Sequence, residues 1–495
     1  MRLARSVIGC LAVGLACASG AQAATLEATP SSLASVFSSS QGGDTIMLAP
    51  GDYGRFAGGS KSSTVTLKPQ AGASPAMDVE FAGASNVRLE GLTIGDLEIS
   101  GSTRDVSVAG SRFTGFAVIR TSEMSNANVV LDGNTHADIN TCGGCYEGRI
   151  TLPGKGSSPS GVTIRNSLFR GGNADGIQNG SRGTSIIGNE FVDIYESAGN
   201  HTDAIQLYGS SNTLVRGNWI HRTSTGIMAP DGADHEVIEH NVIAPGGYPF
   251  AITLSSDDGS IVRHNTLPDG ACSFNLRCGL IAMGPKSGLP AGRGTVIKDN
   301  IFGKISIDSG SATTAENDYN LIADDAPHGA HDRRGRPTYV GGSAPGTFAG
   351  FKLADRSLGS DNASDGTDRG AAIGIVTSLR ASRPSGGARP TGRRGAGTKL
   401  SVRRRVSWRR LRRGLRVRVT SPVRARVTFV LRRKSAKRAI LRRTRTMRAG
   451  TRSFLLRPRR ARLGRRRAMR VVLTVRLTDG SGGATRLRRT IRVRR

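Results

Sequence analysis

A short pattern recurs through the middle of this sequence: a β-branched residue, one or two spacers, asparagine, and then an apolar residue. The clearest copies are Ile164 to Leu168, Ile187 to Phe191, Val215 to Ile220, Ile238 to Val242, Val262 to Leu267 and Ile297 to Ile301. From Asn166 to Asn265 the asparagines follow one another at steps of 23, 29, 23 and 24 residues, a spacing typical of one solenoid coil. The longer step to Asn300 predicts an inserted loop. A coil of short strands has no core of its own, so the repeat predicts an all-β fold, a right-handed parallel β-helix, in which the coils cover one another.

The asparagines of this repeat are expected to be structural. Asparagine tolerates the left-handed conformation of tight turns, and its amide can donate to one neighbour while accepting from another. Equivalent asparagines in stacked coils can therefore form a hydrogen-bonded ladder. We assign this role, and not catalysis, to Asn166, Asn189, Asn218, Asn241, Asn265 and Asn300.

The two ends of the repeat region carry further signals. Ser31 to Phe37 has the pattern of a short amphipathic helix, which would cap the first coil against aggregation. The segment Gly43-Asp-Thr-Ile-Met-Leu-Ala-Pro-Gly-Asp-Tyr53 resembles the opening coil of the pectin-lyase-like superfamily, including chondroitinase-B-like and alginate-lyase-like enzymes. Phe351 to Leu358 and Asp368 to Ala371 are similar to the segment that closes many such domains. The resemblance covers about 350 residues and implies the fold and a polysaccharide ligand, but not one reaction.

Charge divides the chain into unlike parts. About 41 lysines and arginines follow Arg380, against the single acid Asp479, whereas the preceding part has about 29 basic and 36 acidic residues. We therefore predict a signal peptide at 1–23, the β-helix at 24–376, a flexible Gly- and Pro-rich linker at 377–398, and a separate basic domain at 399–495.

The first residues predict export. Arg2 and Arg5 precede an apolar run from Val7 to Ala18, which ends at a small-residue cleavage site near Ala23. No later segment is long and apolar enough to span a membrane, so we expect a secreted, extracellular protein. Acylation at Cys17, as in a lipoprotein, is the alternative, but the leucine there sits one place too close to the cysteine.

Four cysteines remain after the signal peptide. In an oxidising compartment they predict two short-range disulfides, and the alternative is a zinc site, for which Cys142 and Cys145 have suitable spacing. The set is Cys142, Cys145, Cys272 and Cys278.

The basic domain shows near-strict alternation of arginine with apolar residues, as in Leu415 to Val419. This period predicts half-buried strands in a small immunoglobulin-like or fibronectin-like β-sandwich, with Phe429 and Phe454 in its core. Arginine favours bidentate binding of phosphate or carboxylate, so retention on an anionic cell-wall polymer is one interpretation. The other is a solvated arginine surface without a ligand. We do not expect nucleic acid as the partner, because the protein is exported and aromatic residues for base stacking are nearly missing.

Two consecutive coils repeat one polar unit. Asn173-Ala-Asp-Gly-Ile-Gln178 and His201-Thr-Asp-Ala-Ile-Gln206 would stack Asp175 near Asp203 and Gln178 over Gln206, at about the 4.7 to 4.9 Å spacing of strands. Two carboxylates at such a short distance from each other indicate a functional site. The alternative, of equal weight, is that each aspartate caps a turn at a strand start.

These units resemble the Asn-Thr-Asp and Asp-Asp coils of polygalacturonase-like hydrolases. The following coil, Ser224-Thr-Gly-Ile-Met228, lacks the Gly-His-Gly of that family, and no Arg-Ile-Lys follows. Two-carboxylate hydrolysis is therefore the less favoured chemistry.

Elimination from a uronate polymer needs a group that neutralises the substrate carboxylate, a base and a proton donor. With Ile177, Ile205, Ile227, Ile252 and Ile281 as register marks, the same side of the stack offers the candidates His201, Tyr208, Arg222, Asp231, His235 and Lys286. We take Asp175, Asp203, His201, Arg222 and Lys286 as the catalytic candidates, and Gln178, Gln206, Tyr208 and His235 as substrate-binding candidates. A calcium ion held by Asp175, Asp203 and Asp231 would supply the neutralisation, since it prefers oxygen ligands.

The sequence thus predicts a secreted, monomeric protein that acts on an acidic polysaccharide, with β-elimination as the leading reaction. A non-catalytic carbohydrate-binding or adhesion protein is the rival class. Asp234-His235-Glu236 is similar to the Asp-Pro-His-Glu signature of mannuronan C5-epimerases, without the proline, so epimerisation remains a variant beside hydrolysis.

Overall fold

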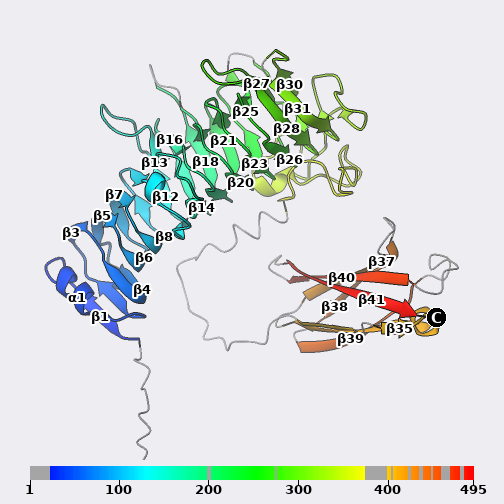
Figure 1. The fold of residues 1–495 in the computed structure, drawn as a ribbon, viewed down its shortest axis with the longest axis horizontal. Coiled ribbons are helices and arrows are strands. Elements are labelled where there is room, and N and C mark those ends of the chain that lie inside the picture. Colours follow the sequence, from blue (N-terminus) through cyan, green and yellow to red (C-terminus); the bar gives the residue numbers. More distant parts are fainter. Residues whose placement is uncertain are drawn as a thin grey trace, which may run out of the picture.

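The computed structural model describes residues 23–197, 202–273, 276–310, 312–373, 399–402, 405–421, 425–433, 439–447, 450–458, 469–479 and 484–494. Almost the whole predicted signal peptide, the predicted linker and His201 lie outside the described residues. Figure 1 shows the strands of the first part stacked as successive coils. Each coil contributes parallel strands to three faces, which we call faces A, B and C.

Face A is a sheet of thirteen parallel strands. They are β1 (Thr25–Ala28), β2 (Thr45–Leu48), β4 (Ser60–Pro69), β6 (Ser85–Glu90), β8 (Arg104–Ala109), β11 (Val129–Asp132), β14 (Val162–Arg165), β17 (Ser185–Ile187), β20 (Leu214–Arg216), β23 (Val237–Glu239), β26 (Ile261–Arg263), β28 (Gly292–Lys298) and β31 (Ala312–Asp318).

Faces B and C share a second sheet, because β5 and β7 bend around the corner between them. Face C contains β3 (Asp52–Phe56), β5 (Ala76–Ala82), β7 (Thr93–Ser100), β10 (Ala117–Ile119), β13 (Gly148–Leu152), β16 (Asp175–Asn179), β19 (Ile205–Leu207), β22 (Ile227–Ala229), β25 (Phe250–Ser255), β27 (Leu280–Gly284) and β30 (Lys304–Ile307). Face B contains β9 (Arg112–Phe113), β12 (Thr135–Ala137), β15 (Leu168–Arg170), β18 (Glu190–Ile194), β21 (Trp219–Thr223) and β24 (Val242–Ala244), and continues in β29 (Ile301–Phe302), β32 (Leu321–Ile322) and β33 (Arg333–Arg334). A short 3-10 helix, η1 (Thr121–Glu123), follows β10.

The interior of the coils is a continuous apolar core with aromatic stacks. On face B the rings of Phe113, His136, Phe169 and Phe191 lie on one another at centroid distances of 4.3, 4.7 and 4.6 Å. At the first coil the predicted amphipathic helix is confirmed as α1 (Leu33–Ser39), which buries Leu33 and Phe37. This helix covers the apolar end of the stack, where no further coil precedes it among the described residues.

The predicted ladder is present at the turn between faces A and B. Asn218 Oδ1 accepts from the backbone N–H of Asn189 (2.9 Å) and from its Nδ2 (3.0 Å). The same pair of bonds links Asn218 to Asn241 and Asn241 to Asn265. Each of these amides also donates to a backbone carbonyl of the preceding coil, so every rung ties neighbouring coils together.

The ladder differs from its prediction at three positions. Asn166 does not belong to it: its amide bonds Asp132 (2.8 Å), and Ser167 takes the ladder position of that coil. Asn166 instead occupies a left-handed turn, with φ of 54°. Asn134 and Asn320 extend the ladder at its two ends, beyond the predicted members.

The two predicted disulfides are confirmed, joining Cys142 to Cys145 and Cys272 to Cys278. The second lies in the long insertion after β26, which accounts for the large step from Asn265 to Asn300. Disulfides form in oxidising compartments. None of the helices among the described residues combines the length and apolar character that crossing a membrane requires.

The segment after β33 folds back over face B. Phe348 and Phe351 of the 3-10 helix η3 (Phe348–Phe351) pack with Ile373 against Val242, and Leu353 packs on Ile301. Face B is therefore covered at these coils and is not an open surface there.

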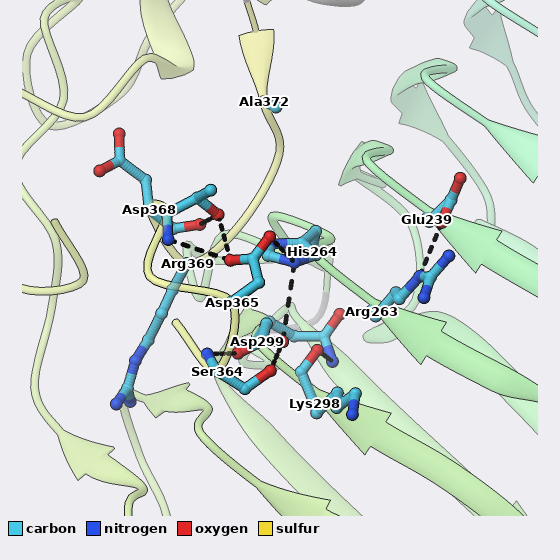
Figure 2. Close-up of polar contacts among 12 residues, drawn as sticks. Glu239, Arg263, His264, Lys298, Asp299, Ser364, Asp365, Asp368, Arg369 and Ala372 are labelled. Carbon is cyan, nitrogen blue, oxygen red and sulfur yellow. Dashed lines mark hydrogen bonds and ion pairs between the residues drawn. The ribbon is translucent and has the colours of Figure 1, made fainter. Parts of the chain in front are cut away.

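Polar bonds fix the end of this segment (Figure 2). Ser364 donates to Asp299 from its backbone N–H (2.5 Å) and its hydroxyl (2.6 Å), and His264 lies 3.6 Å from the same carboxylate. Arg369, which is almost fully buried, donates to the carbonyls of Asn320 and His331. The closing segment thus seals the final turns of the ladder.

Glu236 is a buried acid at the corner before β23. Its carboxylate accepts from the Ser210 hydroxyl (2.7 Å) and from the backbone N–H of Thr213. It is fully buried, so it cannot reach a substrate. Burial raises the pKa of Glu236 to about 7, although the hydrogen bonds from Ser210 and Thr213 oppose the shift.

The C-terminal part is a β-sandwich of two sheets with one apolar core. The smaller sheet has the order β34 (Lys399–Val402), β36 (Leu415–Ser421), β39 (Gly450–Leu456). The larger sheet has the order β35 (Arg405–Ser407), β41 (Ala484–Arg494), β40 (Met469–Asp479), β37 (Ala425–Arg433), β38 (Ala439–Met447), and a short helix α3 (Trp408–Arg413) connects β35 to β36. Phe429 is buried in the core and Phe454 packs against it, as predicted. The immunoglobulin-like topology stays a prediction.

The ladder predicts unequal costs for two asparagine substitutions. Asn241→Ala removes the acceptor of Asn218 and the donor to Val215, leaving buried polar groups unpaired at about 1 to 3 kcal/mol each. We expect the free energy of unfolding to fall by about 3 kcal/mol, measured by urea denaturation with circular dichroism. Asn166→Gly suits the left-handed turn and should cost less than about 1 kcal/mol. Equal losses would mean that turn conformation, and not the ladder, explains the asparagines.

The buried Glu236 predicts a pH dependence of stability. Its pKa in the folded state is raised above the unfolded value, so the folded state holds the proton more tightly. This contribution is fully present below the unfolded pKa of about 4.5 and is lost as the pH rises through about 7. We expect Glu236→Gln to flatten the fall in stability between about pH 5 and 8 in urea unfolding, because glutamine stays neutral. The exposed Glu27→Gln is the control, and an unchanged slope for Glu236→Gln would refute the assignment.

Candidate functional site

The predicted register of face C is confirmed. Ile177 pairs with Ile205, Ile205 with Ile227, Ile227 with Ile252, and Ile252 with Ile281. The side chains of these isoleucines point inward and are fully buried. Their neighbours Gln178 and Gln206 point to the outer side of face C on adjacent strands, where both are buried.

Asp175 begins β16 and Asp203 lies two residues before β19, at the corner between faces B and C. Asp175 Oδ1 accepts from the backbone N–H of Asp203 (2.7 Å), and Asp203 Oδ1 accepts from the Thr225 hydroxyl (2.5 Å). Both carboxylates are buried, with exposures of 1% and 3%. Each one thus ties its coil to the next, which favours the turn-capping interpretation of these aspartates.

Near the N-terminal end of the stack, two aspartates have the same role at this corner. Asp78 Oδ1 accepts from the backbone N–H of Asp96 (2.9 Å), and Asp96 Oδ1 accepts from that of Phe116 (2.8 Å). A carboxylate here substitutes for a backbone acceptor at a point where the chain turns. The recurrence supports an architectural role for Asp175 as well.

Gln178 is the centre of a polar cluster beside this corner. Its Nε2 donates to Glu147 (2.8 Å), to Asp175 Oδ2 (3.1 Å) and to Gln206 Oε1 (2.7 Å). The cluster lies at the start of β16 and β19, on the edge of face C. Solvent reaches Glu147, whereas Gln178 and Gln206 are buried.

The structure does not gather the predicted basic residues around this cluster. Arg222 lies on face B and pairs with Asp193 (2.6 Å), and this hydrogen bond raises its pKa. Lys286 follows β27 and pairs with Asp231 (2.5 Å), at the opposite end of the face C strands. His201 lies outside the described residues.

A calcium site formed by Asp175, Asp203 and Asp231 does not fit this arrangement. Asp231 follows strand β22, whereas the other two aspartates lie at strand starts. Among the residues that the structure describes, no group of three or more His, Cys, Asp or Glu side chains is placed to hold a metal ion.

The two remaining predicted binding residues lie away from the cluster or are partly enclosed. Tyr208 follows β19; its ring packs against Gly180, its hydroxyl lies 3.4 Å from the Leu152 carbonyl, and burial raises its pKa. His235 occupies a left-handed turn before β23, with φ of 57°, at the corner that leads to face A.

A groove of about 350 Å³ on face C has no counterpart in the sequence-based prediction. It crosses β3, β5, β7 and β10, and Glu80 pairs in register with Glu98 on neighbouring strands. Arg55 holds Glu80 (2.6 Å) and Arg120 holds Glu98 (2.7 Å). The groove is lined by Arg55, Asp78, Val79, Glu80, Asp96, Leu97, Glu98, Phe116, Val118, Cys145 and Tyr146.

Tyr146 stands at the side of this groove, beside the disulfide of Cys145, and is 40% exposed. The pKa of Arg120 is raised, mainly by its hydrogen bond to Glu98 and further by the nearby Tyr146 phenol. The groove therefore combines two paired carboxylates, the Arg55 guanidinium and one exposed aromatic ring, and Arg120 bonds Glu98 beside it. The short disulfide loop fixes the backbone next to Tyr146.

The sequence did contain a signal for this groove. Asp78-Val-Glu80 and Asp96-Leu-Glu98 repeat one unit 18 residues apart, just as the Asp-x-Ile-Gln units repeat. In each copy the aspartate caps the corner and the glutamate faces outward. This repeat was not recognised in the sequence, because its step of 18 residues is well below the 23-residue spacing of the asparagines.

Comparison with known proteins supports the fold. The family model described as a right-handed β-helix region matches residues 154–322. No curated protein sequence matches the chain. Among solved structures, the alginate lyase AlyGC of family PL6 is 15% identical, with a TM-score of 0.44 over 64% of this chain and 54% of its own.

Two other solved structures are similar at the same low level. The pectate lyase Pel9A is 14% identical, with a TM-score of 0.34 over 69% of this chain and 92% of its own. The DFA-IIIase from Arthrobacter chlorophenolicus A6, without its lid and in complex with GF2, is 12% identical, with a TM-score of 0.32 over 59% of this chain and 88% of its own. The chain spans about half the length of the alginate lyase. The body of the protein is a right-handed parallel β-helix.

Proposed function

We propose that this protein is an extracellular, polysaccharide-active protein that holds its glycan along face C. The observation that carries the proposal is the groove in which the in-register Glu80 and Glu98 are each held by an arginine next to the exposed Tyr146. Sugars offer hydroxyl groups and apolar ring faces. Carboxylates and guanidinium groups match the first, and an aromatic ring matches the second.

The geometry of face C suits a linear polymer. Outward side chains occupy the same position on successive strands, at about the 4.8 Å spacing of a parallel sheet. From the groove the row continues in register through Thr151 to Gln178 and Gln206, whose side chains are buried. A chain that lies along the solenoid axis therefore meets hydrogen-bonding groups at the coils of the groove, where Glu80 and Glu98 pair in register. Face B is closed by the C-terminal segment at the later coils, which favours face C.

The reaction that we propose is β-elimination from a uronate-containing polymer. A base takes the proton from C5, the bond from C4 to the leaving oxygen breaks, a C4–C5 double bond forms, and the leaving oxygen receives a proton. Arg120 would neutralise the uronate carboxylate, and the Tyr146 phenol would move the proton. This assignment replaces Arg222, which lies on face B, and Lys286, which lies beyond the end of β27.

Hydrolysis is the second candidate, and the paired glutamates favour it. Retaining glycosidases hold two carboxyl groups about 5 to 5.5 Å apart, close to the spacing of neighbouring strands. Glu80 and Glu98 pair on such strands and both face the groove. The remaining alternatives are carbohydrate binding without catalysis and C5-epimerisation. Neither of them cleaves the polymer.

The first test is ultraviolet absorbance of the purified protein with a panel of polyuronates and glycosaminoglycans, with calcium or a chelator. Only elimination creates a double bond conjugated to the carboxylate, so a rise identifies a lyase. We expect Tyr146→Phe to lower that rate by about 100-fold or more, because it removes a proton-transfer group. Arg165→Gln, at an ion pair on face A, is the matched control and should keep the rate.

Three other outcomes are informative. New reducing ends without absorbance, lost in Glu98→Gln, would indicate hydrolysis. A rate lost in Asp203→Asn but kept in Tyr146→Phe would move the site to the Asp175 and Asp203 coils. Binding without any product would show a carbohydrate-binding protein.

A further inference from the structure

The inner side of an edge strand in the C-terminal sandwich carries arginines. In β38, Arg443 pairs with Phe429 and Arg445 with Val427 of β37, and both of these partners are buried in the core. Residues that oppose each other on neighbouring strands point to the same side of the sheet. Arg443 and Arg445 therefore project from the core-facing side, which Leu441 and Met447 of the same strand fill with apolar groups.

These side chains line a groove of about 350 Å³ between the edge strands of the two sheets, β38 and β39. Arg457, just beyond β39, lines it as well. Phe454 lines one wall and packs on Phe429 at a centroid distance of 4.9 Å. Arg443 donates to the Leu455 carbonyl (3.3 Å), which fixes its position in the groove.

A second groove adjoins the first. It has a volume of about 360 Å³ and is lined in part by Arg410, Arg416 and Arg418. Ser453 of β39 lines both grooves, so the two meet across this strand. Together they form what we call the arginine band, which consists of Arg410, Arg416, Arg418, Arg443, Arg445 and Arg457.

The C-terminal part of the chain offers this band almost no counter-charge. Asp479 is the single acidic residue after Arg380, and its backbone pairs with Ala425, the residue of β37 that also pairs with Met447 of β38. Guanidinium groups gathered in a hollow repel one another unless an anion lies between them. A planar guanidinium binds phosphate or carboxylate through two parallel hydrogen bonds, which a hollow between strands can orient.

Protection of the sheet edge is the competing explanation. Charged residues that point inward on an edge strand prevent it from pairing with another molecule. That role concerns β38 alone, whereas the band also includes arginines of α3 and β36 and crosses β39. A ligand accounts for both grooves, and edge protection accounts for one.

We propose that the arginine band binds the oxyanions, phosphate or carboxylate, of an anionic glycan polymer. A glycan fits better than nucleic acid, because the aromatic ring of the first groove, Phe454, is half-buried against Phe429 and offers no open face for stacking a base. The band is independent of the proposed site on face C and would retain the protein on an anionic surface.

The test measures binding of the full-length mature protein to labelled inorganic polyphosphate, polygalacturonate and single-stranded DNA, at about 0.15 M salt. Polyphosphate contains no sugar, so it separates this band from face C. We expect Arg443→Gln with Arg445→Gln to weaken polyphosphate binding by about tenfold or more. Arg432→Gln with Arg442→Gln removes the same charge from the exposed outer side of the same sheet and should weaken it by less than about twofold.

Replacing Arg443 and Arg445 by lysine keeps the charge but removes the planar guanidinium that forms two parallel hydrogen bonds. We expect the polyphosphate affinity of this variant to lie between those of the two glutamine pairs. Thermal melting and size-exclusion chromatography check that each variant folds. Equal losses in both glutamine pairs would reduce the effect to net charge and overturn the site. Aggregation with unchanged binding would establish edge protection instead, and a clear preference for DNA over both other polymers would also refute the proposal. The polymer that binds more tightly, polyphosphate or polygalacturonate, shows whether the band prefers phosphate or carboxylate groups.

Discussion

The hydrogen bonds between successive asparagines hold the coils of this protein in register, and the rest of the β-helix depends on that register. The oxygen of each buried amide accepts from the previous coil, and its nitrogen donates to a carbonyl of that coil, as Asn218 does with Asn189 and Ile186. A one-residue slip would break these bonds and turn the buried isoleucines of face C outward. Because register is fixed, equivalent residues of neighbouring coils meet at predictable places, and polar groups on the outer surface form rows.

Acidic residues have two distinct roles on this scaffold. At the corner between faces B and C, Asp78, Asp96 and Asp175 accept backbone N–H groups of the next coil and serve the fold. Two residues further along, Glu80 and Glu98 point out of the sheet into a groove, where arginines hold them. Position relative to the corner separates these roles, because a carboxylate at the turn replaces a missing backbone acceptor and one on the strand meets solvent.

The two parts of the chain differ in charge and in what their surfaces can hold. The β-helix pairs most of its surface charges, as in the contacts of Arg222 with Asp193 and of Lys286 with Asp231. The part of the chain after Arg380 has a single acid, so its surface charge is strongly positive. A protein that acts on a polymer gains from a second, independent contact, since the tethered chain then meets the first site at a high effective concentration.

The sequence by itself determined the solenoid, its coil length, the inward isoleucines, both disulfides and the sandwich, because each rests on local periodicity or on close spacing along the chain. It also placed Gln178 beside Gln206, which follows from the repeat alone. Only the tertiary structure decided which polar groups share a surface. Arg222 lies on face B, and Lys286 and Asp231 lie at the far end of the face C strands. Ser167, and not Asn166, occupies the ladder position of its coil. The length of each connecting loop sets where a residue meets its neighbours, and the repeat does not specify those lengths.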